Sequence, residues 1–312
     1  MKYIKYGSAA VVVAALLWSV DGLLRIHLQL SLTASVIVFW EHLFGAILLA
    51  PIALYSFKAF KQLTRRQWLA ITGVSFLSGA VGTILYTAAL GRTQFIPFSV
   101  VVLLQQLNPI FAIVTAALLL REPLTKRFVG LTAIALVAAY FLWLPGGMVN
   151  FSTGDGTFMG GLMALGAAAA WGTSTAFSKY ALKGTSTLHV TALRFSITPF
   201  FALLFVGASG SLPVLGSLTF DQFKYLAAIT FSTGLVALII YYWGLKRVLA
   251  SRAAVLELAW PASAVAIGWI WQHKGLTLIQ AIAGIVLTGT IYLIAKDTRT
   301  VTDKTKKTAT SS

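Results

Sequence analysis

Long apolar stretches, separated by short polar segments, run through almost the whole chain. They predict ten helices, at 7–28, 34–57, 67–90, 98–120, 127–145, 158–179, 188–207, 222–245, 252–272 and 277–295. Each is about as long as the 17–25 residues that an α-helix needs to cross a hydrocarbon core roughly 30 Å thick. Because these stretches leave little sequence for a water-soluble core, the pattern predicts an all-α integral membrane protein with ten transmembrane helices.

The second half of the chain repeats landmarks of the first half in the same order. The matching features are Trp18 and Trp171, Tyr86 and Tyr241, Pro109 and Pro261, and the segments REPLT (121–125) and HKGLT (273–277). We therefore predict two five-helix repeats, 1–145 and 158–295, joined by an inter-repeat loop at 146–157. An odd number of helices in each repeat gives the two repeats inverted topology, which is typical of secondary transporters.

Composition supports a membrane protein and narrows its chemistry. Hydrophobic residues make up 58% of the 312 residues and charged residues only 10%, against about a quarter in a typical soluble domain. The chain has no cysteine, which excludes disulfides, thiolate chemistry and cysteine metal sites. The net charge of +16 would suit a nucleic-acid partner, but most basic residues lie in short segments between the apolar stretches, so we expect none.

The basic residues predict the orientation of the chain in the membrane. With the N-terminus placed in the cytoplasm, 19 of the 24 Lys and Arg residues fall in cytoplasmic segments and four in outer segments, at Arg25, Arg92, Lys224 and Lys274; the last, Arg194, lies within a helix. Basic residues are enriched on the cytoplasmic side of membrane proteins. We therefore predict a multi-pass protein of the cell membrane with both termini cytoplasmic.

The two ends of the chain are more polar than the apolar stretches between them. The start MKYIKYG resembles the basic region of a signal peptide, but no small-residue cleavage site follows before Trp18, so we interpret it as the start of the first membrane helix. The tail 296–312 is polar and basic, which predicts a disordered cytoplasmic segment.

These features together resemble the drug/metabolite transporter superfamily, and within it the ten-helix, EamA-type branch. The resemblance rests on the tandem halves, on Trp18 and Trp171, on Arg194 in the second helix of the second half, and on a proline in the fourth helix of each half. REPLT also matches a loop signature of the branch. The resemblance implies export of small metabolites, with amino acids and related amphipathic compounds as the leading substrates. Glu41 stands where many members have an arginine in the first half.

Charged residues inside the membrane are the first candidates for a functional site. They are costly in hydrocarbon and usually face a cavity or a partner. From a rise of about 1.5 Å per residue, Asp21 and Glu41 lie at similar depth in the outer half, and Arg194 and Glu257 lie in the inner half. Arg194 and Glu257 could form a structural ion pair, contact a zwitterionic substrate or form an inner gate.

The two outer carboxylates allow two functional roles. Asp21 and Glu41 could bind the ammonium group of a substrate or carry a coupling proton, because two neighbouring acids raise each other's proton affinity. The structural alternative is that each bonds to a donor nearby. Arg25 lies one helical turn from Asp21, and His42 follows Glu41 directly.

Further candidates are aromatic or uncharged. Trp18 and Trp171 lie about 15 Å into their helices, too deep for an interfacial belt, so they predict cavity-lining or packing positions. The remaining cavity candidates are Tyr86, Gln105, Gln106, Ser174, Tyr241 and Tyr242, whose alternative role is hydrogen bonding between helices. Pro109 and Pro261 predict hinges, because each weakens its helix one turn earlier.

The sequence favours a transporter that works by alternating access over other membrane functions. No metal-ligand spacing, no catalytic Ser/Lys pair and no GxxxxGK[ST] motif occurs, so we expect no enzyme, no metal, no cofactor and no nucleotide drive. A lipid flippase-like carrier is the main alternative, and a membrane-embedded enzyme is a weaker one. The expected partners are a small-molecule substrate and the lipid bilayer. Protons are the candidate coupling ion, and the sequence leaves open whether the protein acts as a monomer or a homodimer.

Overall fold

Helices make up most of the structure, a computed structural model that describes residues 2–120, 124–147, 156–181, 185–245, 256–257 and 259–309. No strand occurs among these residues. In the first half the helices are α1 (Lys2–Leu28), α2 (Ala34–Tyr55), α3 (Phe57–Phe60), α4 (Arg65–Val74), η1 (Ser75–Gly82), α5 (Thr83–Leu90), α6 (Phe98–Leu104), η2 (Gln105–Leu107), α7 (Asn108–Leu120) and α8 (Lys126–Trp143).

The second half follows the same order over the residues that are described. Its helices are α9 (Gly156–Ala181), α10 (Thr187–Ala208), η4 (Leu212–Gly216), α11 (Phe220–Ala228), η5 (Ile229–Val236), α12 (Ala237–Leu245), α14 (Ala259–Ile270) and α15 (Leu278–Ala309). The third membrane helix of each half is thus built from three consecutive pieces, α4–η1–α5 in the first half and α11–η5–α12 in the second.

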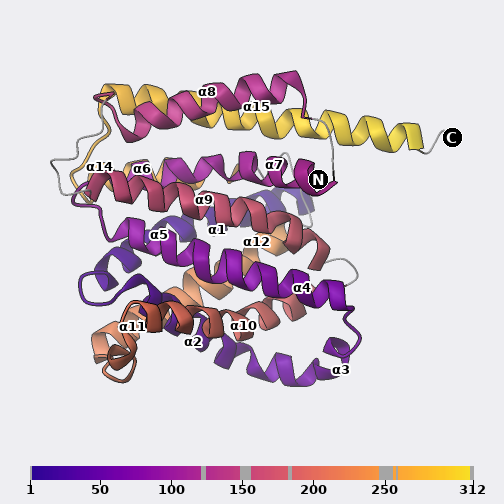
Figure 1. The fold of residues 1–312 in the computed structure, drawn as a ribbon, viewed down its shortest axis with the longest axis vertical. Coiled ribbons are helices and arrows are strands. Elements are labelled where there is room, and N and C mark those ends of the chain that lie inside the picture. The colour runs from indigo at the N-terminus through magenta and orange to yellow at the C-terminus, as the bar shows by residue number, and fades with distance from the viewer. Residues whose placement is uncertain are drawn as a thin grey trace.

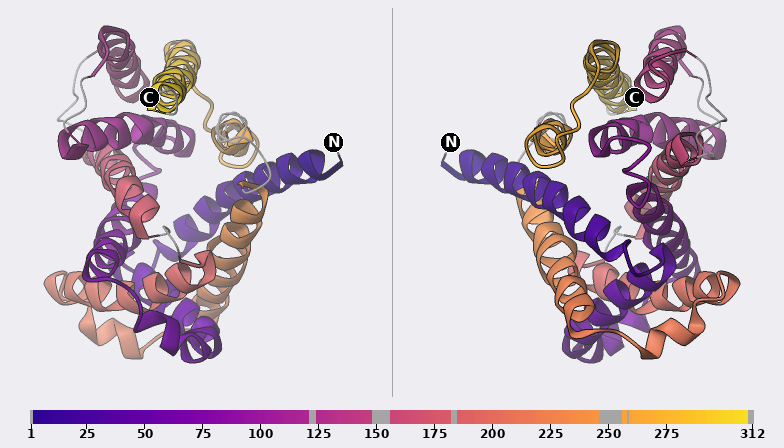
Figure 2. Two further views of the ribbon diagram at one scale, coloured as in Figure 1. Left: turned by 90° about the vertical axis from the view of Figure 1, so that its right-hand side faces the viewer. Right: turned by 90° about the vertical axis from the view of Figure 1, so that its left-hand side faces the viewer.

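The long helices run roughly parallel to one another, with both chain ends on one side of the molecule (Figure 1). At one edge of the bundle α8 packs against α15, and toward the opposite edge α2 packs against α10. Each of these two contacts therefore joins a helix of the first half to its counterpart in the second half. Views along the helices show α1 and α12 on one side of the bundle and α5 and α9 facing them (Figure 2).

Threonine caps start corresponding helices in the two halves. Thr64 and Gln67 form a capping box at the start of α4, and Thr219 and Gln222 form the same box at the start of α11. In this box the threonine hydroxyl and the glutamine side chain each bond to an otherwise unpaired backbone N–H. Local sequence therefore determines where these helices begin in both halves.

The middle of the third membrane helix is a π-helix in each half. These segments, η1 and η5, align in sequence as SFLSG (75–79) and TFSTG (230–234). The hydroxyl of Thr83, the first residue of α5, donates to the carbonyl of Ser78 in η1, five residues earlier, at 2.9 Å. π-Helical turns are rare and occur frequently at functional sites.

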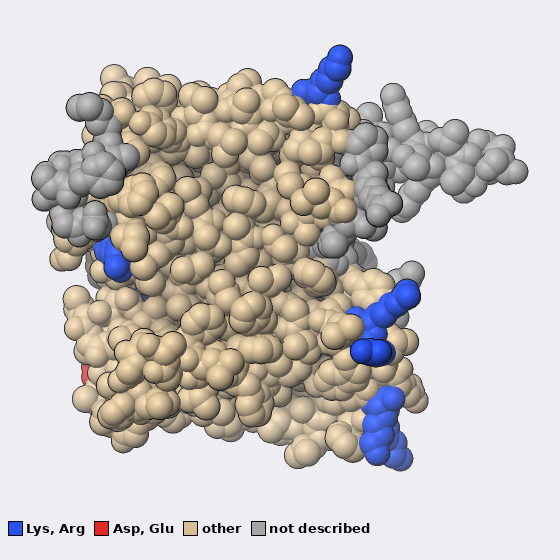
Figure 3. All heavy atoms as spheres, in the orientation of Figure 1, with Lys and Arg blue, Asp and Glu red and all other residues tan. Residues whose placement is uncertain are grey.

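Apolar side chains cover the outside of the bundle. Leu54, Phe200, Leu204, Trp269 and Ile285 are each more than two-thirds exposed. Most of the visible Lys and Arg lie toward the edge where α3, α4 and the chain ends lie, one lies at the opposite edge, and the broad middle of the visible face has almost no charged residue (Figure 3). An apolar band between charged ends suits a bilayer, whose core offers no water to charged groups.

Seven helices of the described chain are long and apolar enough to cross a membrane. They span Tyr6–Leu28, Ala34–Tyr55, Arg65–Leu90, Phe98–Thr115, Lys126–Trp143, Thr187–Ala208 and Phe220–Tyr241. The remaining three predicted membrane helices correspond to α9, to α14 and to the apolar part of α15. Ten crossings and inverted topology stay predictions.

Two details differ from the sequence-based expectation. The first helix ends at Leu28 as predicted, but Arg25, which we counted among the outer segments, lies within it and is only 4% exposed. At the other end α15 continues to Ala309 and takes in most of the tail for which we predicted disorder. Residues 296–309 contain no Gly or Pro to interrupt the helix.

Candidate functional site

A buried charge cluster lies where α1 and α2 meet. The Arg25 guanidinium donates through Nε to Asp21 Oδ2 at 2.5 Å and through Nη2 to Glu41 Oε1 at 2.8 Å. The remaining guanidinium nitrogen, Nη1, donates to Thr87 Oγ1 of α5 at 3.1 Å. All four residues are at most 8% exposed. Because guanidinium has donors on three sides, one arginine satisfies three acceptors and holds both carboxylates together.

The cluster reaches across to the second half of the chain through η5. Thr233 donates from Oγ1 to Asp21 Oδ1 at 2.6 Å, and Thr230 donates from Oγ1 to the backbone carbonyl of Glu41 at 3.2 Å. Both threonines are buried. Glu41 keeps one oxygen, Oε2, with no hydrogen-bond partner in the part of the chain that is described. The polar contacts of this cluster therefore tie the first half to the second.

The structure brings Asp21 and Glu41 together, as their similar depth predicted. Arg25, named from the sequence as a possible donor to Asp21, does bond to it, because the two residues are four apart and share one face of a helix. Sequence reasoning did not foresee that Arg25 also binds Glu41, for which it had named His42. The predicted helix 7–28 already contained Arg25, and counting this residue among the outer segments assigned the last helical turn to the loop.

Arg194 and Glu257, which we expected could meet, lie in separate groups. Arg194 on α10 donates from Nη2 to the Ser78 hydroxyl of η1 at 2.9 Å. Glu257 accepts at Oε1 from the Tyr241 hydroxyl at 2.6 Å. No ion pair joins the two among the described residues. An estimate of depth along a helix carries no information on which face of the helix a side chain occupies.

Five aromatic side chains from five helices form a chain of ring contacts, which we call the aromatic cluster. Trp18 lies 5.1 Å from Tyr241 and 6.4 Å from Trp260, measured between ring centroids. Tyr86 lies 6.3 Å from Trp260 and 5.3 Å from Trp171. The rings are tilted or edge-on, with interplanar angles of 51–71°. Such pairs contribute beyond the area that they bury.

Trp260 is the member of this cluster that sequence reasoning missed. Its ring contacts both Trp18 and Tyr86 and so connects the two ends of the cluster. The one sequence signal for Trp260 was its position directly before Pro261. The repeat-related pairs, Trp18 with Trp171 and Tyr86 with Tyr241, all lie in the cluster.

The other sequence candidates lie mostly in helix contacts. Ser174 is buried and donates to the carbonyl of Trp171 in its own helix at 2.8 Å. Gln105 is buried and donates from Nε2 to the carbonyl of Ala164 at 2.8 Å. Gln106 is half-buried in the same turn. Tyr242 is helical, but its side chain lies outside the described set.

The two predicted hinge prolines lie at interruptions or starts of helices. Before Pro109 the helix tightens into the single 3₁₀ turn η2, so α6 and α7 are two pieces of one membrane helix. Pro261 is the third residue of α14. A 3₁₀ turn in mid-helix often marks a hinge, but a hinge role for either proline stays a prediction.

The comparisons with known proteins match both halves of the chain. The sequence pattern of the EamA-like transporter family fits residues 5–144 and again residues 158–296. The chain belongs to the EamA-like transporter family. Membership explains the repeated landmarks and assigns the chain to the transporters rather than the enzymes.

Two curated relatives and one solved structure extend the match. A protein called riboflavin transporter ImpX, from Fusobacterium nucleatum, is 29% identical over 294 residues, which cover 93% of this chain and 97% of the relative. An uncharacterized transporter from Methanothermobacter thermautotrophicus is 23% identical over 240 residues, or 75% of this chain and 66% of the relative. One crystal structure matches with a TM-score of 0.58 and 17% sequence identity, over 93% of this chain and 95% of the matched chain. At this identity the match supports the fold only.

The geometry of this EamA-like transporter suits binding rather than bond-making. Among the described residues no group of three His, Cys, Asp or Glu could hold a metal ion. What the site does offer is a buried ionic cluster, tilted aromatic faces and isolated hydroxyls. These groups can bind, orient and release a molecule of small size.

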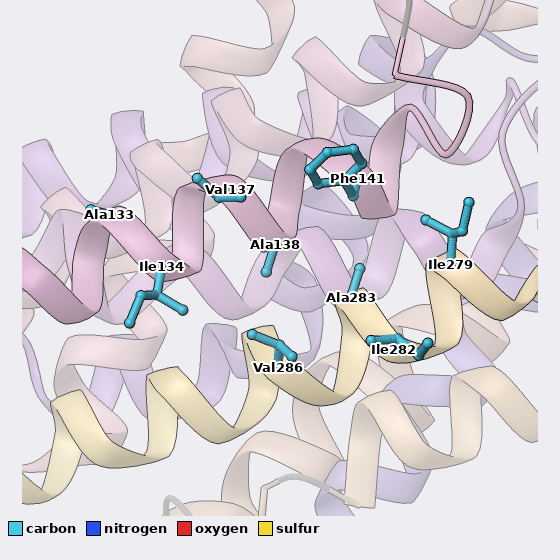
Figure 4. A pocket seen from close by; sticks show the side chains of 9 residues that line it. All are labelled: Ala133, Ile134, Val137, Ala138, Phe141, Ile279, Ile282, Ala283 and Val286. Carbon is cyan, nitrogen blue, oxygen red and sulfur yellow. The ribbon is translucent and has the colours of Figure 1, made fainter.

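A separate groove on this transporter lies between α8 and α15 (Figure 4). It has a volume of about 560 Å³ and is lined only by apolar residues, Ala133, Ile134, Val137, Ala138, Phe141, Ile279, Ile282, Ala283 and Val286. Most of these side chains also belong to the exposed apolar surface of the bundle. Neither the charge cluster nor the aromatic cluster contributes to it.

Proposed function

We propose that the chain is a secondary transporter that moves a small amphipathic metabolite across the cell membrane by alternating access of its two halves. The observation that carries this proposal is the buried cluster of Asp21, Arg25 and Glu41, which Thr233 ties to the other half of the chain. Ionic groups at this depth are costly, so those found in membrane helices usually pair with one another or face a substrate path.

Two contacts between the halves suggest how access could alternate. In one, Asp21 and Glu41 of the first half bond to η5 of the second. In the other, Arg194 of the second half bonds to η1 of the first. Glu41 and Arg194 occupy equivalent places in the two repeats by our alignment. A transporter that loosens one contact while it keeps the other would open first to one side and then to the other.

With the orientation that the basic residues predict, the first of these contacts belongs to the outer side. Further bonds join the halves at that end. Gln222 donates to the Ser31 hydroxyl at 2.9 Å, and His27 lies 3.3 Å from Asp221. The structure therefore corresponds, in this proposal, to a state that is closed toward the outside.

Amino-acid export remains the narrower prediction from the sequence. Its chemistry would need Asp21 or Glu41 for a substrate ammonium group, but both carboxylates already bond to Arg25. An ammonium group would have to displace that guanidinium. The name of the relative from Fusobacterium nucleatum, a riboflavin transporter, adds a ring compound to the candidates.

Counterflow in liposomes that contain the purified full-length protein tests the proposal. Liposomes are loaded with one unlabelled compound, either riboflavin, tryptophan or leucine, and uptake of the same labelled compound is followed with and without a pH gradient. We expect saturable counterflow for at least one compound, and loss of it in Arg25→Met but not in the exposed control Lys224→Ala. If uptake of all three compounds were the same as in loaded liposomes without protein, transport of this substrate range would be contradicted.

The pH gradient separates the coupling alternatives. If Asp21 or Glu41 carries a proton, net uptake follows the gradient, and Glu41→Gln abolishes that dependence while counterflow persists. If transport is facilitated diffusion, the gradient changes neither net uptake nor counterflow. The same liposome assay with the pH gradient reversed shows in which direction relative to the gradient the compound moves, and so whether export or import is expected in cells.

A further inference from the structure

The aromatic cluster contains two buried polar atoms that the protein itself leaves without a partner. The Tyr86 hydroxyl and the Trp260 indole N–H find no hydrogen-bond partner among the described residues. Tyr86 is only 3% exposed. An unsatisfied polar group in a dry interior costs free energy, so native proteins rarely keep one without a reason.

The outer members of the cluster are, by contrast, already bonded. Trp171 donates from Nε1 to the carbonyl of Ser78 at 3.1 Å, and Tyr241 donates to Glu257. Within the described part of the aromatic cluster, the two buried donors that lack an acceptor thus belong to adjacent rings, Tyr86 and Trp260, whose centroids lie 6.3 Å apart.

We propose that this cluster binds a flat, uncharged heteroaromatic ring system that carries ring carbonyl groups, with Tyr86 and Trp260 donating hydrogen bonds to those carbonyls. The proposal rests on the proposed transport function and names the substrate class of the same protein. Rings that pack against one another here, with centroids 5.1–6.4 Å apart, can instead hold a planar ring by stacking and edge contacts when the cluster opens. Carbonyl oxygens are the acceptors that two unsatisfied donors require.

The charges around the cluster favour an uncharged ring. Among the described residues, the carboxylate of Glu257 already accepts from Tyr241. Asp21 and Arg25, which lie near enough to Tyr86 to act on it electrostatically, are already paired with each other. A charged substrate ring would lose its hydration without gaining a counter-ion there. Isoalloxazine, the ring of riboflavin, has the required flatness, neutrality and carbonyl groups, so riboflavin is a suitable probe.

Binding to the purified full-length protein tests the proposal separately from transport. Riboflavin fluorescence is followed during titration with wild-type protein, Tyr86→Phe and Trp260→Phe. We expect quenching on binding to wild type, and a roughly tenfold loss of affinity in each variant, as for one lost hydrogen bond to a buried donor. The matched controls are Trp269→Phe, on the same helix but 72% exposed, and Tyr292→Phe, 40% exposed on α15; both should bind riboflavin like wild type.

Thermal unfolding of the same variants separates binding from packing. Tyr86→Phe removes a hydroxyl that has no partner in the structure, so the ligand-free variant should unfold at the same temperature as wild type or above it. A large drop in that temperature would show a packing role for the hydroxyl and overturn the proposal.

The remaining outcomes distinguish the two proposals. Equal riboflavin affinity in wild type, Tyr86→Phe and Trp260→Phe would place the ring elsewhere and overturn the inference. No riboflavin binding together with saturable leucine counterflow would overturn the substrate class and leave the transport function intact. Donor-dependent riboflavin binding without counterflow of any compound would support the site and overturn the transport function.

Discussion

At the scale of single residues, Arg25 determines how the buried charges are tolerated. It joins two carboxylates and a threonine hydroxyl in a place with almost no solvent. Removing one partner of a buried ion pair is much more costly than replacing the whole group by neutral side chains, because it leaves an uncompensated charge. This asymmetry makes the cluster testable by comparing single and combined substitutions.

We expect Arg25→Met to destabilise the protein by about 3–5 kcal/mol, because Asp21 and Glu41 would face each other without a cation. The combined variant Asp21→Asn, Arg25→Met, Glu41→Gln should regain most of that stability while it stays inactive in counterflow. Thermal unfolding in detergent measures both. A triple variant as unstable as the single one would show that the charge of Arg25 is not what the cluster needs.

A second residue-scale prediction concerns the close approach of η1 to Trp171. A Cβ atom at Gly82 would lie 2.6 Å from both Cδ1 and Nε1 of the indole, closer than real side chains approach. Gly82→Ala should therefore displace Trp171, weaken its bond to Ser78, and cost about 1–3 kcal/mol of stability through overpacking. Reduced counterflow and a lower unfolding temperature are the expected results.

Gly130→Ala is the matched control for that substitution. Gly130 lies within α8, and a Cβ atom there would meet nothing within 4 Å. Replacing a helical glycine by alanine in open space should stabilise the protein by about 0.5–1 kcal/mol. If both glycine substitutions changed the unfolding temperature in the same direction, steric contact with Trp171 would not be the cause.

At the scale of elements, the π-helical segments η1 and η5 organise the contacts between the halves. Ser78 in η1 bonds to Arg194 of α10, the second helix of the other half. Thr233 in η5 bonds to Asp21 of α1, the first helix of the other half. Ser78 and Thr233 are equivalent in the alignment of SFLSG with TFSTG. A widened turn exposes hydroxyls and carbonyls to neighbouring helices, which an ordinary helix keeps to itself.

We predict that Thr233→Val and Ser78→Ala shift the balance of open states in opposite directions. Losing one hydrogen bond of about 1 kcal/mol changes a two-state population about fivefold. Since the chain has no cysteine, Ser263→Cys on α14 can report access to an impermeant thiol reagent added outside. Thr233→Val should speed labelling, Ser78→Ala should slow it, and Thr233→Ser, which keeps the hydroxyl, should label like the parent. The same direction of change in Thr233→Val and Ser78→Ala would reject two opposing contacts.

At the scale of the whole molecule, the distribution of charge predicts how the bundle lies in the membrane. Most of the visible Lys and Arg side chains lie at one end of the helices, one lies at the opposite edge, and the face between the ends is apolar (Figure 3). Basic residues remain on the cytoplasmic side during insertion, so the end that carries α3, α4 and both chain ends should be cytoplasmic.

Two single-cysteine variants check this orientation. Lys61 follows α3, and Ser217 follows η4 at the far end of α10 from the chain ends; both are exposed. In intact cells an impermeant thiol reagent should label Ser217→Cys and leave Lys61→Cys unlabelled until the membrane is opened. Labelling of Lys61→Cys alone would reverse the topology and move the charge cluster to the inner side.

The sequence alone determined the membrane class, the places of the helices, the repeated halves and the family. Hydropathy and basic residues act on one helix at a time, because the bilayer imposes length and polarity on each separately. The same argument selected Asp21, Glu41, Trp18, Trp171 and Tyr86 before any contact was known.

Only the tertiary structure decided which of these residues meet. It placed Arg25 between the two carboxylates, gave Arg194 and Glu257 different partners, and brought Trp260 into the aromatic cluster. Partner choice depends on the rotation of each helix about its axis and on how neighbouring helices pack. A shift of one residue turns a side chain by about 100°, so small differences in packing, which hydropathy does not encode, decide every polar contact of the site.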